Sequence, residues 1–316
     1  MSREAADFEG RGVKRPWATR LADAEGFERL ASELRGSELQ SVLLEVMQRR
    51  AGARTAGDVL TQYVRDGFCA PASVDLRVST ELDAHLLAAA HAFEAVELSP
   101  VAPLGTCSAV ALTHQNRVLS ALRGTEVVSD PTNVLALECA RRLRARRGSV
   151  IHLTTSQRVV RAQPVPKLPG YSQHFRIFVL ASAGAETKDH GFTVETLTLH
   201  VRTMLAALDR LEQHGYHFGA RRVDVLGTPE RAALASRIAQ ALSPLATAGE
   251  LQHRYYSGGL RYQLWVTAPD GAEVPLVDGG TFDWVATLTS NRRAVYVASG
   301  AGSQLMALQF RSGEHR

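Results

Sequence analysis

Residues 275–288 read PLVDGGTFDWVATL, and residues 292–306 read RRAVYVASGAGSQLM after a short polar break. No other part of the chain says as much about its architecture. The first run predicts a strand that ends in a turn at Gly279 and Gly280, with Asp283 just past the turn. Glycine has no Cβ, so the two glycines let a ligand approach the backbone closely. The second run predicts an apolar strand that leads into a small-residue turn and a further apolar stretch.

Beyond these two runs, strand and helix patterns occupy separate blocks of the chain. The strand-like runs are residues 93–101, 118–122, 126–129, 150–154, 159–162, 174–182, 223–226, 254–258, 262–267, 275–277 and 294–298. The helical runs are residues 83–93, residues 193–214, a segment opened by Pro131 and a segment from Thr228 to before Pro244. This arrangement predicts an α+β fold in which helices flank an antiparallel sheet.

Three regions are expected along the chain. Residues 1–20 are charged and lack the apolar stretch of a secretory signal, so we expect a disordered lead-in. Residues 21–78 predict a small helical module, in which Ser37 caps a helix with Gln40 as its capping-box partner. Residues 79–316 form the core. The module either packs on the core as decoration, or docks a partner or covers a ligand, and the sequence leaves both readings open.

Composition excludes several classes of protein. The chain has 316 residues, of which 45% are hydrophobic and 22% charged, as is ordinary for a globular protein. Cys69, Cys107 and Cys139 lie far apart and form no CxxC pair, which argues against a zinc site or a disulfide framework. The chain contains no run of 18 apolar residues, so no membrane-spanning helix is predicted. We therefore expect a cytoplasmic protein with no metal site and no membrane partner.

The charge balance permits nucleic-acid binding without requiring it. The formal net charge is +4 and the isoelectric point is about 9.1. The densest basic run holds five arginines between residues 141 and 147. It is either a solvated helix end whose cations suit the helix dipole or an RNA-facing patch. No aromatic residues interleave with the run, so nucleic acid is not the expected partner.

The order of the motifs resembles the catalytic core of histidyl-tRNA synthetase, a class II aminoacyl-tRNA synthetase, over about residues 80–308. The run from Gly279 to Asp283 is similar to a Gly-Gly-Arg-Tyr-Asp turn of that family. The segment HRYYSGGLRYQLWV (residues 253–266) resembles the family's histidine-specific signature, and Tyr255 and Tyr256 match its tyrosine pair. The resemblance implies a class II synthetase-like sheet and places these residues at a ligand site. Residue type alone also allows the tyrosines to be core.

The junction at Asp130 and Thr132 has two interpretations. A carboxylate and a hydroxyl at the start of a helix can hold an ammonium group through charge-assisted hydrogen bonds. They can equally be a plain N-cap that satisfies free backbone N–H groups. Spacing alone favours the N-cap. The resemblance brings ammonium binding level with it, because the related synthetases hold the substrate's α-amino group with an acidic residue and a threonine at this junction.

A Pro-rich loop joins two apolar strands, and three arginines lie near it, namely Arg158, Arg161 and Arg176. Arginines beside a hairpin can bind phosphate or carboxylate through bidentate hydrogen bonds, or they can simply face solvent. The layout resembles motif 2 of class II synthetases, in which an arginine on the first strand binds the ATP α-phosphate. Arg158 matches that arginine, although the family's glutamate two residues on is Val160 here.

Two departures from the family concern catalysis. Leu251 stands where the family places a catalytic arginine, and Ser303 stands where motif 3 places its ATP-binding arginine. Thr281 replaces the arginine of the Gly-Gly turn, and Arg254 stands in place of an aspartate. Without these cations the charge that develops on phosphate and carboxylate loses its stabilisation, so no catalytic residue is assigned.

The resemblance therefore implies a non-charging paralogue, similar to the regulatory subunit of ATP phosphoribosyltransferase. An anticodon-binding domain is not expected after residue 316. We expect an amino-acid-like ligand, a partner enzyme or protein, and a homodimer formed through the motif 1-like element at residues 93–103. The alternative is a ligase that uses ATP and Mg²⁺ to activate an amino acid for an acceptor other than tRNA. A third reading is a structural protein with a vestigial pocket.

Overall fold

The computed structural model describes residues 24–165 and 171–311. The lead-in expected over residues 1–20 lies outside these ranges. The described residues divide into two compact units, one formed by residues 24–56 with Leu122–Gly124, the other by residues 57–121, 125–165 and 171–311. Among the described helices, none combines the length and the apolar character needed to cross a bilayer.

The first unit holds α1 (Ala24–Glu28), the π-helical turn η1 (Arg29–Glu33) and α2 (Gly36–Gly52). The predicted cap of α2 was wrong: Ser37 lies inside the helix, and the capping box is formed by Arg35 and Glu38. The backbone N–H of Arg35 donates to Glu38 Oε2 at 3.0 Å. Glutamate can play this part because its side chain reaches back over the free N–H groups of the first turn.

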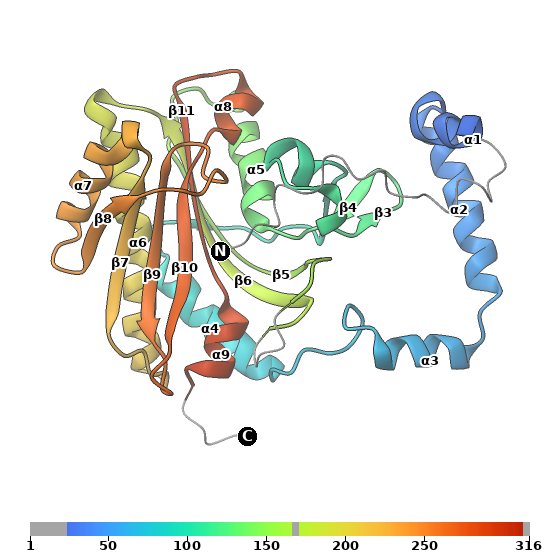
Figure 1. Cartoon of the computed structure of the whole chain (residues 1–316), viewed down its shortest axis with the longest axis horizontal. Helices are drawn as coiled ribbons and strands as arrows, with labels where there is room; N and C mark the ends of the chain where they lie inside the picture. Colours follow the sequence, from blue (N-terminus) through green and yellow to red (C-terminus); the bar gives the residue numbers. More distant parts are fainter. Residues whose placement is uncertain (1–23, 166–170, 312–316) are drawn as a thin grey trace. The chain divides into compact units, whose positions relative to one another are not determined.

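An eight-stranded sheet forms the centre of the second unit, in the order β1-β5-β6-β11-β10-β9-β7-β8 (Figure 1). Its strands are β1 (Glu94–Ala95), β5 (Ile151–Val160), β6 (His174–Ala185), β7 (Arg221–Gly227), β8 (Ala246–Glu250), β9 (Leu260–Thr267), β10 (Glu273–Phe282) and β11 (Ala294–Ala301). The pairs β1–β5 and β7–β8 at the two edges are parallel, and the other pairs are antiparallel. A small sheet contains β2 (Val101–Pro103), β3 (Ser120–Ala121) and β4 (Thr125–Val127).

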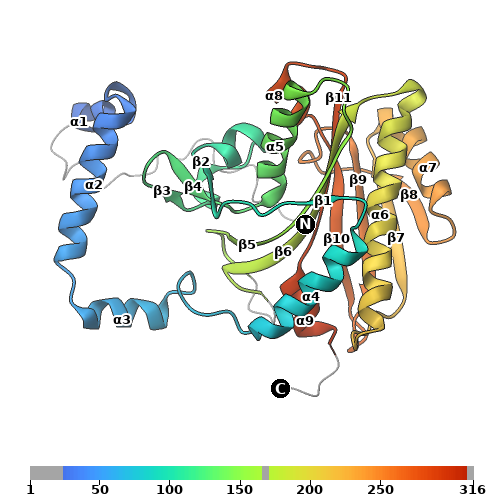
Figure 2. The ribbon, with the colours of Figure 1, turned by 180° about the vertical axis from the view of Figure 1, so that it is seen from behind.

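Helices cover both faces of the large sheet. Seen from behind, α6 and α4 lie across one face (Figure 2), and α5 packs on the other with α8 beside it. The remaining helices are α3 (Ala56–Arg65), α4 (Leu76–Ala89), α5 (Pro131–Ala145), α6 (Gly191–Glu212), α7 (Ala232–Ala241), α8 (Trp284–Thr289) and α9 (Ser303–Gln309). The short helical turns are η2 (Thr106–Val110), η3 (Gln115–Arg117), η4 (Lys188–His190) and η5 (Pro229–Arg231).

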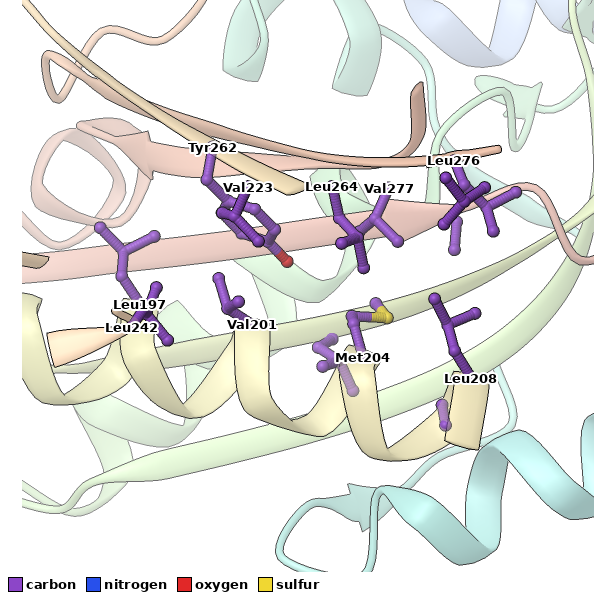
Figure 3. Packing of buried hydrophobic residues seen from close by; sticks show 14 of the residues in the cluster. Leu197, Val201, Met204, Leu208, Val223, Leu242, Tyr262, Leu264, Leu276 and Val277 are labelled. Atoms are coloured by element: carbon purple, nitrogen blue, oxygen red, sulfur yellow. The ribbon is translucent and has the colours of Figure 1, made fainter. Parts of the chain in front are cut away.

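Strand alternation divides the buried apolar side chains into two clusters. On one face, Leu197, Val201 and Met204 of α6 point towards the sheet, and Met204 lies opposite Leu264 and Val277 (Figure 3). Their spacing of three to four residues puts them on one side of the helix. Each such side chain contributes on the order of 1.5–3 kcal/mol when fully buried.

The opposite face has its own cluster under α5. Leu135 and Cys139 of α5 pack there with Leu153 of β5 and Val179 of β6. Because successive residues of a strand point to opposite faces, Phe178 belongs to the first cluster and Val179 to the second. The sheet is therefore buried on both sides, which fixes the register of its central strands.

The predicted α+β fold with a largely antiparallel sheet flanked by helices is confirmed, and several local predictions were wrong. Ile151–Val160 form one strand where two were expected, over residues 150–154 and 159–162. Residues 93–101 were expected as one strand, but residues 96–100 lie outside strands, and residues 254–258 are a loop where a strand was expected. The Gly279–Gly280 pair makes no turn, because β10 continues through it to Phe282. Short apolar or aromatic runs cannot by themselves tell a strand from a buried loop.

Packing explains the two glycines of β10. A Cβ at Gly279 would lie 2.4 Å from Ser299 Oγ, and a Cβ at Gly280 would lie 2.3 Å from the carbonyl oxygen of Leu260 and 2.5 Å from the ring of Tyr256. No side chain fits at such distances. The glycines let neighbouring strands and the Tyr256 ring approach β10 closely.

A polar network crosses the buried face under α6. His200 is fully buried, with Nδ1 2.8 Å from Ser299 Oγ and Nε2 2.8 Å from Ser182 Oγ. Ser182 Oγ also lies 2.7 Å from Nδ1 of His152. Burial lowers the pKa of His200 from its usual 6.5 to about 3, and the nearby His152 adds to the shift. The folded protein therefore holds His200 as a neutral imidazole.

This network predicts acid sensitivity. The unfolded chain binds the His200 proton near pH 6.5 and the folded chain near pH 3, so the stabilisation is complete above pH 6.5 and is lost as the pH falls towards 3. Between pH 7 and pH 5 this group should remove about 2 kcal/mol from the free energy of unfolding. Urea denaturation at several pH values should show a shallower pH dependence for His200→Gln than for wild type. Parallel pH profiles would contradict the assignment.

Candidate functional site

A cavity of about 420 Å³ lies where the N-terminus of α5 meets β6, β10 and β11. Six of the residues predicted from the sequence line it, namely Asp130, Thr132, Arg161, Tyr255, Tyr256 and Gly279. They come from four separate stretches of sequence. The fold thus brings most of the candidate residues together, and we call this space the first cavity.

Asp130 is an N-cap and a cavity residue at once. Its Oδ1 accepts hydrogen bonds from the backbone N–H of Thr132 at 3.0 Å and from Thr132 Oγ1 at 2.8 Å. Its Oδ2 lies 3.8 Å from Arg161 Nη2. The two interpretations of the sequence are therefore compatible, because one oxygen caps the helix and the other leaves acceptor capacity for a ligand.

Arg161 is held in place by the protein. Its Nε donates to the carbonyl oxygen of Ser129 at 3.1 Å, and its guanidinium group lies 5.0 Å from the ring centre of Phe175. These contacts fix the guanidinium beside Asp130 without neutralising it fully, since the ion pair is long. A cation and a carboxylate side by side suit a ligand that carries both charges.

The tyrosine pair forms an aromatic wall. Tyr255 and Tyr256 meet edge to face with ring centres 5.4 Å apart, and Phe282 stacks on Trp284 at 4.0 Å. Burial raises the pKa of both tyrosine hydroxyls, and Asp130 and Asp278 add to the effect for Tyr255 and Tyr256 respectively. Both phenols therefore stay protonated and can donate hydrogen bonds. The wall offers flat apolar surface to a ligand's side chain.

Tyr256 belongs to a partly buried ion-pair network that the sequence did not predict. Its hydroxyl donates to Asp278 Oδ1, and Arg261 binds the same carboxylate through Nε at 2.9 Å and Nη2 at 2.6 Å. Arg261 also lies 5.2 Å from the centre of the Tyr256 ring. Alternate residues of a strand point to the same face of a sheet, so strand alternation could have predicted that Arg261 and Asp278 face the cavity.

Two further cavity residues were missed. Arg117 is the last residue of the short turn η3, and its guanidinium has no hydrogen-bond or ion-pair partner within residues 24–165 and 171–311. Cys107 lies in η2, and burial raises the pKa of its thiol. A protonated thiol is a poor nucleophile, so the cysteine supports no thiol catalysis. Neither residue carries a local sequence signal, because irregular loops place both.

The predicted arginine clamp is not formed, which is a correction to the motif 2 interpretation. Arg158 and Arg176 face each other in the β5–β6 register on the side of the sheet that α4 and α9 cover. Arg158 Nη1 lies 3.0 Å from His174 Nδ1 and 3.1 Å from Gln304 Oε1, and Arg176 Nη1 lies 2.5 Å from Asp83 Oδ2. The residue before Arg158 in β5 is Gln157, which faces the same side of the sheet as the cavity and carries no charge.

Gly280 and Asp283 do not line the first cavity. Gly280 serves the close packing described above. Asp283 accepts a hydrogen bond from Ser257 Oγ and lines a second cavity, of about 780 Å³. It precedes α8 but makes no side-chain cap to that helix.

The positions at which the family carries its two arginines hold buried side chains in this protein. Leu251 belongs to the apolar cluster under α5, and Ser303 is fully buried at the start of α9. The hydroxyl of Ser303 has no hydrogen-bond partner among the described residues. In the described part of the chain, no group of three or more His, Cys, Asp or Glu side chains could hold a metal ion.

Comparison with solved structures defines the class of fold, whereas no protein-family model and no curated protein matches the sequence. A threonyl-tRNA synthetase RNA-binding domain from Cryptosporidium parvum superimposes with a TM-score of 0.58 at 11% identity, covering 73% of this chain and 63% of that one. The second unit thus has the fold of class II aminoacyl-tRNA synthetase catalytic domains, as predicted.

Two further neighbours are of the kinds that the sequence motifs resemble. One is an ATP phosphoribosyltransferase regulatory subunit/histidyl-tRNA synthetase from Bacillus halodurans, with a TM-score of 0.55, 13% identity, and coverage of 73% of this chain and 79% of that one. The other is a histidine–tRNA ligase subunit from Alicyclobacillus acidocaldarius, with a TM-score of 0.57, 14% identity, and coverage of 77% and 96%. At these identities the likeness concerns the fold.

Proposed function

We propose that this protein is a non-charging, histidyl-tRNA synthetase-like paralogue that binds an amino-acid-like ligand in the first cavity. It acts as a regulatory or binding subunit for a partner enzyme or protein. The observation that carries the proposal is that Asp130 and Arg161 lie side by side at the N-terminus of α5, next to the tyrosine pair. Three free cysteines fit a cytoplasmic location.

The charges in the first cavity suit a zwitterion. Asp130 Oδ2 can accept from an ammonium group, while Arg117 and Arg161 can donate to a carboxylate. Asp278 and Arg261 neutralise each other and so add no net charge. The ligand's side chain would then lie against Tyr255. A volume of about 420 Å³ accommodates a metabolite the size of an amino acid.

The environment disfavours ATP chemistry. A triphosphate needs cations, and Leu251 and Ser303 supply none at the positions where the related enzymes have them. Arg158, the third candidate, faces the opposite side of the sheet. Each lost charge-assisted contact costs roughly 1.5–3 kcal/mol, so three would remove the stabilisation on which adenylate formation depends.

A thermal-shift screen with the twenty amino acids, ATP and ATP–Mg²⁺ tests the proposal. At least one amino acid should raise the melting temperature, since a ligand at 100 times its Kd adds about 2.7 kcal/mol to the stability of the folded state. ATP–Mg²⁺ alone should have little effect. If no amino acid stabilises the protein, the pocket is vestigial and the proposal fails.

Amino-acid-dependent pyrophosphate exchange separates the proposal from the ligase alternative. The amino acid found in the screen should support no measurable exchange, for the electrostatic reasons given above. Robust exchange would replace the regulatory reading with an adenylate-forming ligase. The proposed homodimer, formed through residues 93–103, is checked by sedimentation velocity, in which a concentration-independent monomer would contradict it.

A further inference from the structure

The second cavity shares a wall with the first. His253, Tyr256 and Phe282 line both spaces. The loop that provides this wall is tied down at its two ends, where the N–H of Leu251 donates to Gly227 and the N–H of Gly258 donates to Thr281. With about 780 Å³ the second cavity is the larger of the two, and nothing in the proposed function uses it.

Three carboxylates line the second cavity, and each already has protein donors. Glu186 accepts from Thr193 Oγ1 at 2.5 Å, from the backbone N–H of Thr187 at 3.1 Å, and from His190 Nδ1 at 3.3 Å. Asp283 accepts from Ser257 Oγ. The hydroxyl of Thr228 and a backbone N–H bind Glu230 and lower the pKa of its carboxyl. Each of the three carboxylates is therefore already held by at least one protein hydrogen bond.

Three guanidinium groups line the same cavity and lack carboxylate partners. Arg254 and Arg292 are exposed and make no hydrogen bond or ion pair within the described ranges. Arg231 lies 3.4 and 3.5 Å from the ring nitrogens of His190 and meets no carboxylate in the described part of the chain. The formal charges of the three lining carboxylates and the three guanidiniums cancel. The preference for an anion therefore rests on the partners of these groups, because every carboxylate has a protein donor, whereas Arg254 and Arg292 have no protein acceptor among the described residues.

We infer that the second cavity is a binding site for a small phosphate-type anion, held by Arg231, Arg254 and Arg292. A guanidinium presents a planar fork of N–H donors that matches two phosphate oxygens, and a phosphate has enough acceptors for three such groups. The arginines come from three separate parts of the chain, namely η5, the shared loop and the loop after α8. An anion between them would join all three.

The inference does not depend on the proposed function, because it concerns a different set of side chains. It also accounts for Arg254, which stands where the resemblance places an aspartate. In this fold Arg254 lines the second cavity and does not line the first.

Isothermal titration of the full chain with inorganic pyrophosphate at low salt tests this inference. We expect one site with a Kd below about 1 mM. Arg254→Gln and Arg292→Gln should each weaken binding about ten-fold or more, as expected for the loss of a charge-assisted contact. Arg147→Gln is the matched control, since Arg147 is exposed and lines neither cavity, and it should leave the Kd unchanged within about two-fold.

Arg161→Gln distinguishes the two cavities. If pyrophosphate occupies the second cavity, this substitution in the first cavity should leave its affinity within about two-fold of wild type. Loss of binding in Arg161→Gln together with unchanged binding in Arg254→Gln and Arg292→Gln would move the anion to the first cavity and overturn the inference. Absence of any binding at 10 mM pyrophosphate, or an equal loss in the Arg147→Gln control, would overturn it too.

Discussion

Asp130→Asn is expected to weaken binding of the amino acid found in the screen by about ten-fold or more while the fold stays intact. The carboxylate Oδ2 is the acceptor for the ligand's ammonium group in our account, and a charge-assisted hydrogen bond is worth about 1.5–3 kcal/mol. Asparagine caps a helix about as well as aspartate, so the bond from the backbone N–H of Thr132 survives. Calorimetric titration of the variant with that amino acid measures the effect.

Thr132→Ala is the matched comparison for this prediction. The threonine hydroxyl donates to Asp130 Oδ1, and it can offer the ligand only a neutral acceptor. Its removal should cost roughly 0.5–1.5 kcal/mol of binding free energy, which is about two- to ten-fold in Kd. Equal affinity of Asp130→Asn and wild type would leave Asp130 as a helix cap alone and remove the main residue from the proposed site.

Gly280→Ala is expected to destabilise the protein by about 1–3 kcal/mol or more. A Cβ would lie 2.3 Å from the carbonyl oxygen of Leu260, which is backbone and cannot move without disturbing the pairing of β9 with β10. It would also press on the Tyr256 ring at 2.5 Å. The free energy of unfolding from urea denaturation gives the measurement.

Gly302→Ala serves as the control for the strand glycine. Gly302 precedes α9 with a φ of −71°, and an added Cβ would meet its nearest neighbour, Leu305 Cβ, at an ordinary 3.5 Å. Its replacement should cost less than about 1 kcal/mol. Similar losses in the free energy of unfolding for the two variants would show that β10 does not need glycine for packing, and would contradict this explanation of Gly280.

Local pattern was enough to predict much of the second unit. The apolar stripe of α6 gave a helix over residues 193–214 where the structure has 191–212, and Pro131 marked the first residue of α5. The sheet order could not be predicted in this way, because it depends on pairings between strands that lie far apart in sequence. Gly279 and Gly280 were misread since glycine serves turns and close packing alike.

The candidate site likewise contains residues that local pattern could place and residues that it could not. Asp130 and Thr132 could be placed because a helix start fixes where both side chains point. Arg158 was misplaced because a one-residue difference in strand register turns a side chain to the other face of the sheet. Arg117 was missed because tertiary contacts alone bring it to the cavity. Asp278 was missed because the strand period that places it on this face does not reveal its partners, Arg261 and Tyr256.

A crystal structure of the complex with the amino acid that stabilises the protein most tests the central claim most directly. The account predicts the ligand in the first cavity, with its ammonium nitrogen about 2.7–3.2 Å from Asp130 Oδ2 and its side chain against Tyr255. Its carboxylate should lie within reach of Arg117 or Arg161. A ligand bound elsewhere, or one whose ammonium group makes no contact with Asp130, would contradict the account.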